Sequence, residues 1–258
     1  MDTICEKKPA DTTVTLFGKE FSYPFFAGPV GAVKLHYGEK YTDQEYNEIL
    51  LAGCMEGGIA AFTGDGSDAR VMQEATAAVQ KLGGLGIPTV KPWDMDTIRD
   101  KMELVKRSGA FAVAMDIDAA GLPFLQNLNP PAGSKSVEEL KEIVKIAEIP
   151  FILKGIMTVR GAKKALEAGA QAIVVSNHGG RVLDQCPSTA EVLPDIVKAV
   201  DGRMKIFVDG GIRTGTMSLK HWHGRGCGTD RPAVSCTAAY GAGVAGCECI
   251  YCQKQVVN

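Results

Sequence analysis

The chain has 258 residues, of which 45% are hydrophobic and 22% charged, so it can bury the core of one compact domain over residues 1–258. The formal net charge of -2 and the lack of a Lys and Arg cluster disfavour nucleic acid as a partner. No apolar run approaches the roughly 20 residues of a membrane span, and residues 1–13 lack the apolar core of a signal peptide, so we expect a cytoplasmic protein.

The predicted elements begin with residues 12–23, where alternation around Gly18 indicates a β-hairpin at the floor of the fold. Short apolar runs then alternate with segments of helical periodicity, which is the pattern of repeated βα units. The predicted strands are 25–30, 59–63, 88–93, 111–117, 150–155, 172–177 and 205–210. The predicted helices are 43–53, 68–82, 95–108, 136–147, 158–168 and 188–200, the fourth with a capping box of Ser136 and Glu139.

Two folds are built from such alternation, and the polar residues distinguish them. A doubly wound sheet usually carries a glycine fingerprint after its first strand, whereas here polar residues and glycines follow several strands. This favours an α/β fold of the TIM type, a (β/α)8 barrel. Its eighth strand should follow a helix near 216–220, but residues 221–232 have the pattern of neither helix nor strand. We therefore expect the eighth strand and the C-terminal region to be disrupted or truncated.

The segment 173–184, IVVSNHGGRVLD, is an apolar strand that ends in a polar loop with two glycines. The tip of a barrel strand is where catalytic groups usually lie. His178 can accept a proton near neutral pH, Gly179 and Gly180 let the backbone approach a ligand, and Arg181 can bind a carboxylate with two hydrogen bonds. The alternative is a capped turn in which His178 and Arg181 are only solvated.

The run SNHGGR at 176–181, with Leu183 and Asp184 after it, resembles the signature of the FMN-dependent α-hydroxy acid oxidases and dehydrogenases, a family that includes glycolate oxidase and lactate oxidase. Two further motifs of that family occur in the right order, a strand that ends in Lys154-Gly155 and the run VDGGIR at 208–213. The resemblance implies a barrel that binds FMN and oxidises a 2-hydroxy acid to a 2-oxo acid.

The resemblance also implies catalytic roles. His178 would be the base, Arg181 would hold the substrate carboxylate, and Lys154 would stabilise the reduced flavin ring. Asp118 matches the position of the acid that orients the histidine, with Asp116 as the nearby competitor. The alternatives are a surface lysine at position 154 and a solvated aspartate at the strand end.

The resemblance also implies which residues bind the cofactor. The loop after the last predicted strand would bind the flavin phosphate through its backbone N–H groups and an arginine. The implied flavin contacts are Gly28, Pro29, Val30, Thr63, Lys154, Ser176, Asp209, Gly210, Gly211, Arg213 and Arg231.

The chain departs from the family at the substrate site. Family members usually supply a tyrosine after the third strand and a second arginine beyond the fourth, but here the sequence reads VKPW at 90–93 and has no arginine in 118–133. Loss of one charge-assisted pair costs on the order of 1.5–3 kcal/mol and can change which acid is bound. Lys91 is a candidate replacement cation.

The tail at 221–258 is atypical because it is rich in Cys and His where the family has a helix and a closing strand. One hypothesis is a local shift of the reading frame over 221–230, since codons for the family pattern read one base late give His221-Trp222-His223. The other is a metal site, because His and thiolate ligands at short spacings suit zinc. Its candidate ligands are His221, His223, Cys227, Cys247, Cys249 and Cys252.

We therefore predict FMN-dependent oxidation of a small 2-hydroxy acid, with oxygen, a quinone or another protein as the electron acceptor and, by family analogy, a homo-oligomeric assembly. No metal is expected at this site. Two alternatives stay open, namely a flavin-binding remnant without turnover and a metal-binding protein that uses the Cys-rich tail.

Overall fold

The computed structural model describes residues 11–129 and 131–212. Its strands are β1 (Val14–Leu16), β2 (Lys19–Phe21), β3 (Ala61–Thr63), β4 (Gly86–Val90), β5 (Val113–Asp116), β6 (Phe151–Lys154), β7 (Ala172–Val175) and β8 (Lys205–Val208). Its α-helices are α1 (Val33–Tyr37), α2 (Asp43–Glu56), α3 (Ala69–Lys81), α4 (Met95–Arg107), α5 (Pro123–Gln126), α6 (Val137–Ala147), α7 (Val159–Ala168) and α8 (Thr189–Val200). Short 3-10 turns follow β5 and β7, as η1 (Ile117–Gly121) and η2 (His178–Gly180).

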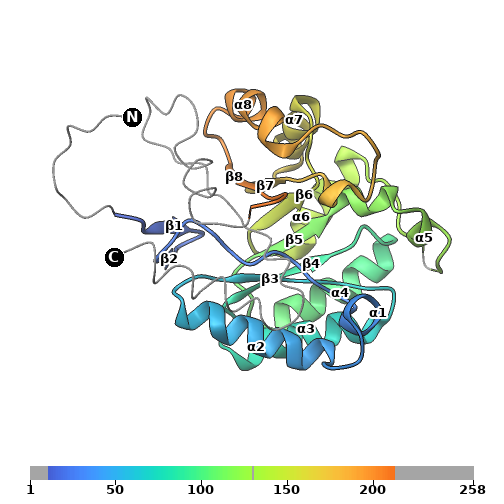
Figure 1. Ribbon diagram of the computed structural model, residues 1–258. Helices are drawn as coiled ribbons and strands as arrows, with labels where there is room; N and C mark the ends of the chain where they lie inside the picture. The colour runs from blue at the N-terminus through green and yellow to red at the C-terminus, as the bar shows by residue number, and fades with distance from the viewer. Residues whose placement is uncertain (1–10, 130, 213–258) are drawn as a thin grey trace.

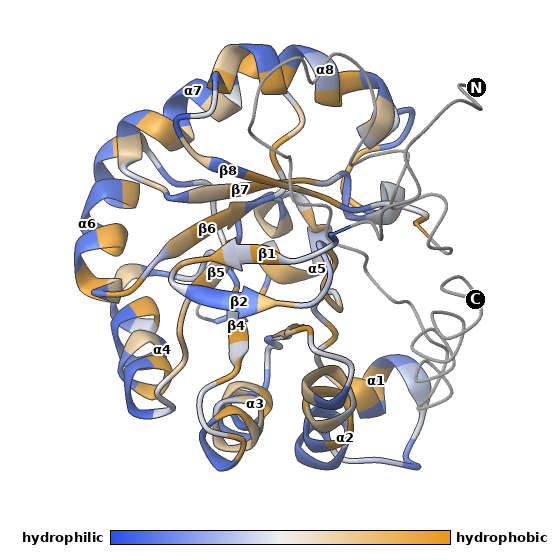
Figure 2. Ribbon diagram, turned by 90° about the vertical axis from the view of Figure 1, so that its left-hand side faces the viewer, coloured by the Kyte–Doolittle hydropathy of each residue, from blue (hydrophilic) through white to orange (hydrophobic). Residues whose placement is uncertain are grey.

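The strands β3 to β8 form one parallel sheet in chain order, and a parallel bridge from Ala27 to Ala61 adds a further partner next to β3. The sheet curls, and helices α2, α3, α4, α6, α7 and α8 lie around its outer face (Figures 1 and 2). This is the arrangement of a TIM-type barrel, as predicted. The segment in which the eighth barrel strand was sought, 221–232, lies outside the described residues.

Most predicted elements are confirmed, with differences in their bounds. The hairpin is β1 paired with β2, and the predicted helices correspond to α2, α3, α4, α6, α7 and α8. The first predicted strand, 25–30, is reduced to the single bridge at Ala27. The bounds of the strand predicted over 88–93 were wrong, since β4 begins at Gly86 and ends at Val90. The capping box of Ser136 and Glu139 is confirmed.

Inside the barrel, the two-residue period of the strands selects which side chains form the core. At least one inward side chain from each of β4 to β8 joins an apolar cluster, together with Phe26, Phe62 and residues of the hairpin. The strand residues are Ile87, Ala114, Ile152, Ala172, Val174 and Phe207. The β1–β2 hairpin lies across this end of the barrel (Figure 2), so its Leu16 and Phe21 cover the cluster. A second core lies between the sheet and the helices.

Two residues further along the chain, at or just after the carboxyl ends of these strands, the inward positions become polar. The residues are Thr89, Asp116, Lys154, Ser176 and Asp209, and all five are buried. Parallel strands place their carboxyl ends at one edge of the sheet, so these side chains form one polar layer above the apolar cluster. Within 11–129 and 131–212, we find no helix with the length and apolar character that crossing a membrane requires.

Candidate active site

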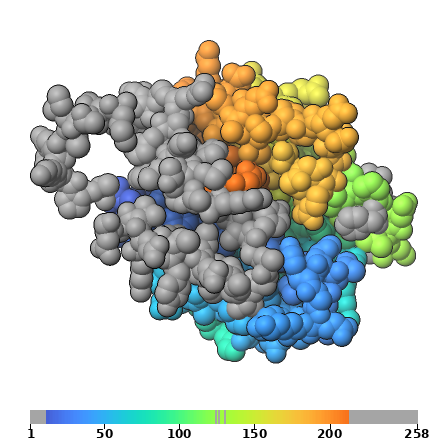
Figure 3. Space-filling model, viewed as in Figure 1, coloured from blue at the N-terminus to red at the C-terminus, as the bar shows by residue number. Residues whose placement is uncertain are grey.

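A cavity of about 300 Å³ lies at the carboxyl ends of the strands. Its walls come from the loops after β3, β4, β7 and β8, from the ends of β5 and β6, and from α1. In the space-filling view, the blue segment that contains α1 and the orange segment after β7 face each other across a recess (Figure 3). Five of the predicted site residues line the cavity close to one another, namely Lys91, Lys154, His178, Arg181 and Asp209.

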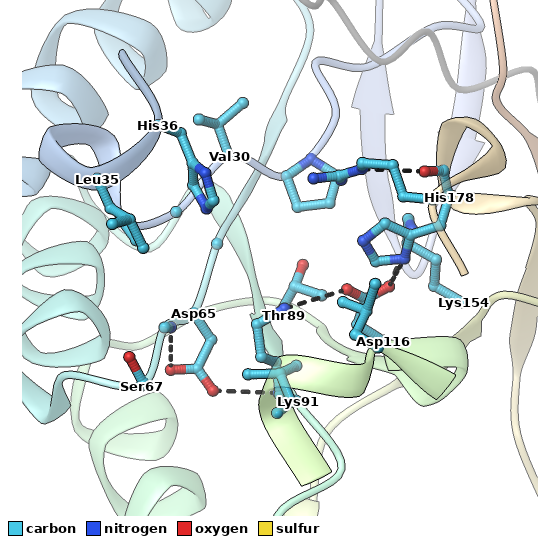
Figure 4. A pocket seen from close by; sticks show the side chains of 18 of the residues that line it. Val30, Leu35, His36, Asp65, Ser67, Thr89, Lys91, Asp116, Lys154 and His178 are labelled. Carbon is cyan, nitrogen blue, oxygen red and sulfur yellow. Dashed lines mark hydrogen bonds and ion pairs between the residues drawn. The ribbon is translucent and has the colours of Figure 1, made fainter. Parts of the chain in front are cut away.

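His178 stands at the start of the loop that follows β7. Its backbone N–H donates to Ser176 Oγ at 3.2 Å, and its φ of 55° places it in the left-handed region. Gly179 and Gly180 continue with φ of 66° and 76°, a conformation that glycine adopts without strain. The His178 side chain is buried, and its Nδ1 lies 3.0 Å from Asp118 Oδ1 and 3.5 Å from Asp116 Oδ1. An Nδ1–H that donates to these carboxylates leaves the second ring nitrogen directed into the cavity (Figure 4).

Asp116 and Lys154 form a buried ion pair beneath the histidine. Lys154 Nζ lies 2.9 Å from Asp116 Oδ1 and 4.0 Å from Asp209 Oδ2, while Lys91 Nζ lies 3.6 Å from Asp116 Oδ2. Burial alone would raise the pKa of Asp116, but the Lys154 and Lys91 ammonium groups outweigh it and bring this pKa below its usual range. The carboxylates around Lys154 likewise outweigh its burial and raise its pKa. Both members of the pair are therefore charged.

Asp118 differs from Asp116 in its surroundings. Burial is the main cause that raises the pKa of Asp118, and the hydrogen bond from His178 opposes it. The other oxygen, Oδ2, is buried and has no hydrogen-bond partner among the described residues. A side chain at Gly155, whose φ is 98°, would collide with the Asp118 carboxyl group. The glycine after Lys154 is therefore required for the aspartate to reach His178.

The two remaining cations face the cavity from opposite loops. Arg181 Nε donates to the His178 carbonyl oxygen at 3.1 Å, which leaves its terminal N–H groups to a ligand. Lys91 follows β4, and only 14% of its side chain is exposed. The sequence left open that His178 and Arg181 are only solvated. The burial of His178 contradicts this for the histidine, whereas Arg181 is exposed at the rim.

Pro29 and Val30 also line the cavity, as the resemblance implied for flavin contacts. Ser176 is buried beside the site, and its hydrogen bond lowers the pKa of Asp209, which burial raises more strongly. Thr63 is buried in β3. Gly28, Thr63, Ser176, Gly210 and Gly211 are not among the cavity-lining residues. Arg213, Arg231 and the Cys-rich tail lie outside the described residues.

Two groups stand out among the cavity residues that sequence reasoning missed. The first comes from α1, where Leu35, His36 and Tyr37 form part of the wall, because five residues are too few to show helical periodicity. Burial, and then the charges of Arg181 and Lys91, lower the pKa of His36. The second is Asp65 in the loop after β3, since an aspartate between two glycines is typical of any turn.

Asp116, Asp118 and His178 also have the spacing of metal ligands, with one ligand atom from each within 4.8 Å of the others. However, the Lys154 ammonium already occupies a position 2.9 Å from Asp116. A bound cation there would be repelled by Lys154 and Lys91 at close range. The arrangement is better suited to an anionic ligand above the two lysines than to a metal ion.

Comparison with known proteins agrees with this geometry. A 2-hydroxyacid oxidase of Dictyostelium discoideum is 55% identical over 82 residues, which are 32% of this chain and 21% of that protein. An L-lactate oxidase of Nostoc sp. is 44% identical over 97 residues, 38% of this chain and 26% of that protein. The matched part thus spans about a quarter of these curated relatives.

A solved structure of a mandelate oxidase variant with (S)-mandelic acid superposes with a TM-score of 0.77 at 23% identity, over 99% of this chain and 78% of that one. At this identity, the likeness concerns the fold. A family model described as "FMN-dependent dehydrogenase" matches residues 1–128 and 126–248, which is nearly the whole chain. The chain therefore belongs to the FMN-dependent dehydrogenase family.

Proposed function

We propose that this chain binds FMN and oxidises a small 2-hydroxy acid to the corresponding 2-oxo acid. The observation that carries the proposal is a histidine with an acidic partner at 3.0 Å, in the same cavity as Lys154, Lys91 and Arg181. A base next to cations that can hold a carboxylate is the arrangement that removal of a proton from a 2-hydroxy acid requires. The names of the relatives, which are oxidases of 2-hydroxy acids and L-lactate, support the same substrate class.

The residues around the cavity fit FMN. Thr89 Oγ1 is buried without a hydrogen-bond partner among the described residues and lines the cavity. Gly31 also lines it, and a side chain there would meet the backbone of Asp65, so the wall stays open at this point. Pro29, Val30 and Lys154 would hold the ring, the last through a positive charge that favours an anion. Bound FMN supplies the acceptor for the two electrons that the acid loses.

His178 performs the proton transfer. Its Nδ1–H is held by Asp118 and lies near Asp116, so the ring orientation is fixed and the free nitrogen accepts a proton from the substrate. Ionised Asp116 and the hydrogen bond to Asp118 stabilise the imidazolium that results. Lys154, which is charged and buried below, balances the carboxylates so that the site does not carry excess negative charge.

Arg181 and Lys91 bind the substrate carboxylate. Arg181 has terminal N–H groups free for two parallel hydrogen bonds, because its Nε is the atom that is held by the His178 carbonyl. Lys91 takes the place of the arginine that family members carry beyond the fourth strand. Its ammonium group is 3.6 Å from Asp116, longer than a hydrogen bond, and so can turn toward a carboxylate in the cavity.

The test is anaerobic reduction of the purified protein with FMN by a panel of acids such as glycolate, lactate and mandelate. We expect flavin absorbance that is bleached by at least one acid, with release of the matching 2-oxo acid. Bound flavin that no acid reduces would support a flavin-binding remnant without turnover. Zinc without flavin in the purified protein would instead support the metal-binding alternative at the tail. Reoxidation with oxygen, a quinone or a protein acceptor, and the mass in solution, then test the proposed acceptors and a homo-oligomer.

A further inference from the structure

The buried carboxylate of Asp65 has no part in the proton transfer, yet it lines the same cavity. Its side chain is fully buried and accepts four hydrogen bonds. Oδ1 accepts from Gly66 N at 2.8 Å and from Lys101 Nζ at 2.6 Å, and Oδ2 accepts from Lys91 N at 3.1 Å and from Trp93 Nε1 at 2.8 Å. Asp65 therefore joins the loop after β3, the loop after β4 and helix α4.

Lys101 neutralises the negative charge of Asp65, so the ion pair presents no net charge to the cavity. The Lys101 ammonium comes from α4, its side chain is 9% exposed, and it also lies 5.5 Å from the centre of the Trp93 ring. Because Lys101 balances the charge of Asp65, the Lys91 ammonium is not drawn to it. Lys91 gives Asp65 only its backbone N–H, and its side chain extends toward Asp116 instead (Figure 4).

We propose that Asp65 is a positioning residue that fixes the backbone of Lys91 and thereby holds the Lys91 ammonium where it binds the substrate carboxylate. Residues 91–93 are a loop in which Trp93 N donates to the Lys91 carbonyl, and within the described residues no strand pairing extends beyond Val90. The Pro92 carbonyl accepts from Gly133 N at 2.9 Å and from Lys135 Nζ at 3.1 Å, whereas the backbone N–H of Lys91 is held by Asp65. Asp65 therefore fixes the Lys91 end of this loop. The binding role of Lys91 rests on the proposed function, whereas the anchoring of Lys91 by Asp65 does not.

Two double variants remove the anchor without leaving a buried charge. D65A/K101M removes the carboxylate together with its counter-ion, and D65N/K101M keeps one acceptor oxygen for Lys91 N–H. A matched control is I143A, which removes core volume from α6, an element that supplies no hydrogen bond to this network, and should lower the melting temperature alone.

The first readout is reductive methylation of lysines in the purified protein, followed by mass spectrometry. We expect methylation of Lys91 to rise several-fold in D65A/K101M and less in D65N/K101M. Methylation of buried Lys154 should stay unchanged in both variants, and methylation of Lys91 should stay unchanged in the I143A control. Unchanged methylation of Lys91 in D65A/K101M, or a rise only in proportion to the loss of stability seen in I143A, would overturn the inference. If D65A/K101M does not fold, D65N/K101M alone decides by the same criterion.

The second readout is the KM for the best 2-hydroxy acid, measured in a cycle with K91M. Loss of a charge-assisted contact corresponds to a KM raised roughly ten- to a hundredfold, which we expect for K91M and, in part, for D65A/K101M. In the K91M background, D65A/K101M should raise the KM no further. Equal fold-changes in both backgrounds would show that Asp65 acts apart from Lys91. A wild-type protein that no acid reduces would refute the proposed function instead, and the methylation result would still stand on its own.

Discussion

The two ends of the barrel are built from the same strands but serve different purposes. At the amino end, Phe26, Phe62 and Phe207 pack edge to face under the β1–β2 hairpin, with ring centres 5.6 and 5.7 Å from the Phe207 ring. At the carboxyl end, Asp116 and Lys154 form a charged pair. One inward step along a strand is two residues, or about 6.6 Å, so stability and chemistry are separated by a single layer.

This separation is incomplete, because the polar layer is itself buried. Lys154 and Asp116 are each about as buried as the apolar residues below them, and each depends on its partner's charge. Removing one member of such a pair affects stability as well as chemistry.

The largest effect is expected for His178→Asn, in the polar layer. Loss of a general base usually lowers the rate by roughly 10²–10⁴-fold, and we expect that range for anaerobic flavin reduction by the best acid. Bound flavin and the melting temperature should change little, because asparagine is polar, is no larger than histidine and keeps a side-chain N–H for Asp118. A variant that retains a third of the wild-type rate would rule out the assignment of His178 as the base.

Phe207→Ala tests the apolar layer. Phe207 is fully buried and contacts two other rings, so the cavity left by the substitution should lower the free energy of unfolding by about 3–5 kcal/mol. Chemical denaturation measures this loss, with Val197→Ala on the exposed side of α8 as a control that should change stability by about 0.5 kcal/mol or less. The rate of flavin reduction per folded molecule should stay near the wild-type rate. If that rate falls as far as in His178→Asn, the two layers are not separate in function.

Asp116→Asn tests how far the charged pair supports the fold. The cations near Asp116 hold its folded-state pKa below the ordinary value of 3.8, so its stabilisation is present above that value and is lost as the pH falls through the folded-state pKa. At about pH 7 we expect the variant to be about 1.5–3 kcal/mol less stable than wild type. The difference should shrink in strong acid, where both proteins lack the charge.

The measurement for Asp116→Asn is a series of denaturation curves from neutral to acidic pH. Asp96→Asn is the matched control, since Asp96 is an exposed aspartate on α4 and should have almost no effect at any pH. A constant difference between wild type and Asp116→Asn across the whole series would mean that the charge of Asp116 does not stabilise the fold.

The repeated pattern explains why much of the fold could be predicted. Runs such as FIL at 151–153 and AIVV at 172–175 are apolar on both faces, as strands buried between a core and a helix layer must be. The error at β4 has a physical cause outside the strand. Lys91 and Trp93 continue the apparent run in sequence, but their hydrogen bonds to Asp65 hold them in a loop. A contact with a residue 26 positions earlier leaves no local signal.

Prediction of the site from the sequence had the same limit. Motifs at the strand ends placed His178, Arg181 and Lys154 in one cavity, because the carboxyl ends of parallel strands meet. Asp116 and Asp118 were left as competitors, and both approach the His178 ring, at 3.5 and 3.0 Å. The sequence alone could not separate them, because they are only two residues apart and the 3-10 turn η1, which contains Asp118, follows directly after β5.

The smallest effect is expected for Gly18→Ala, in the hairpin that covers the apolar layer. Gly18 has a φ of 78° and open space around it, so an alanine there meets no atom but adopts an unfavourable backbone conformation at a cost of about 1–2 kcal/mol. Gly133→Ala is the matched control, because Gly133 also has open space and its φ lies outside the left-handed region. Thermal unfolding should show a lower midpoint for Gly18→Ala alone, with flavin reduction unchanged in both. An equal loss in the two variants would mean that strain in the hairpin turn does not limit the stability of the closed end.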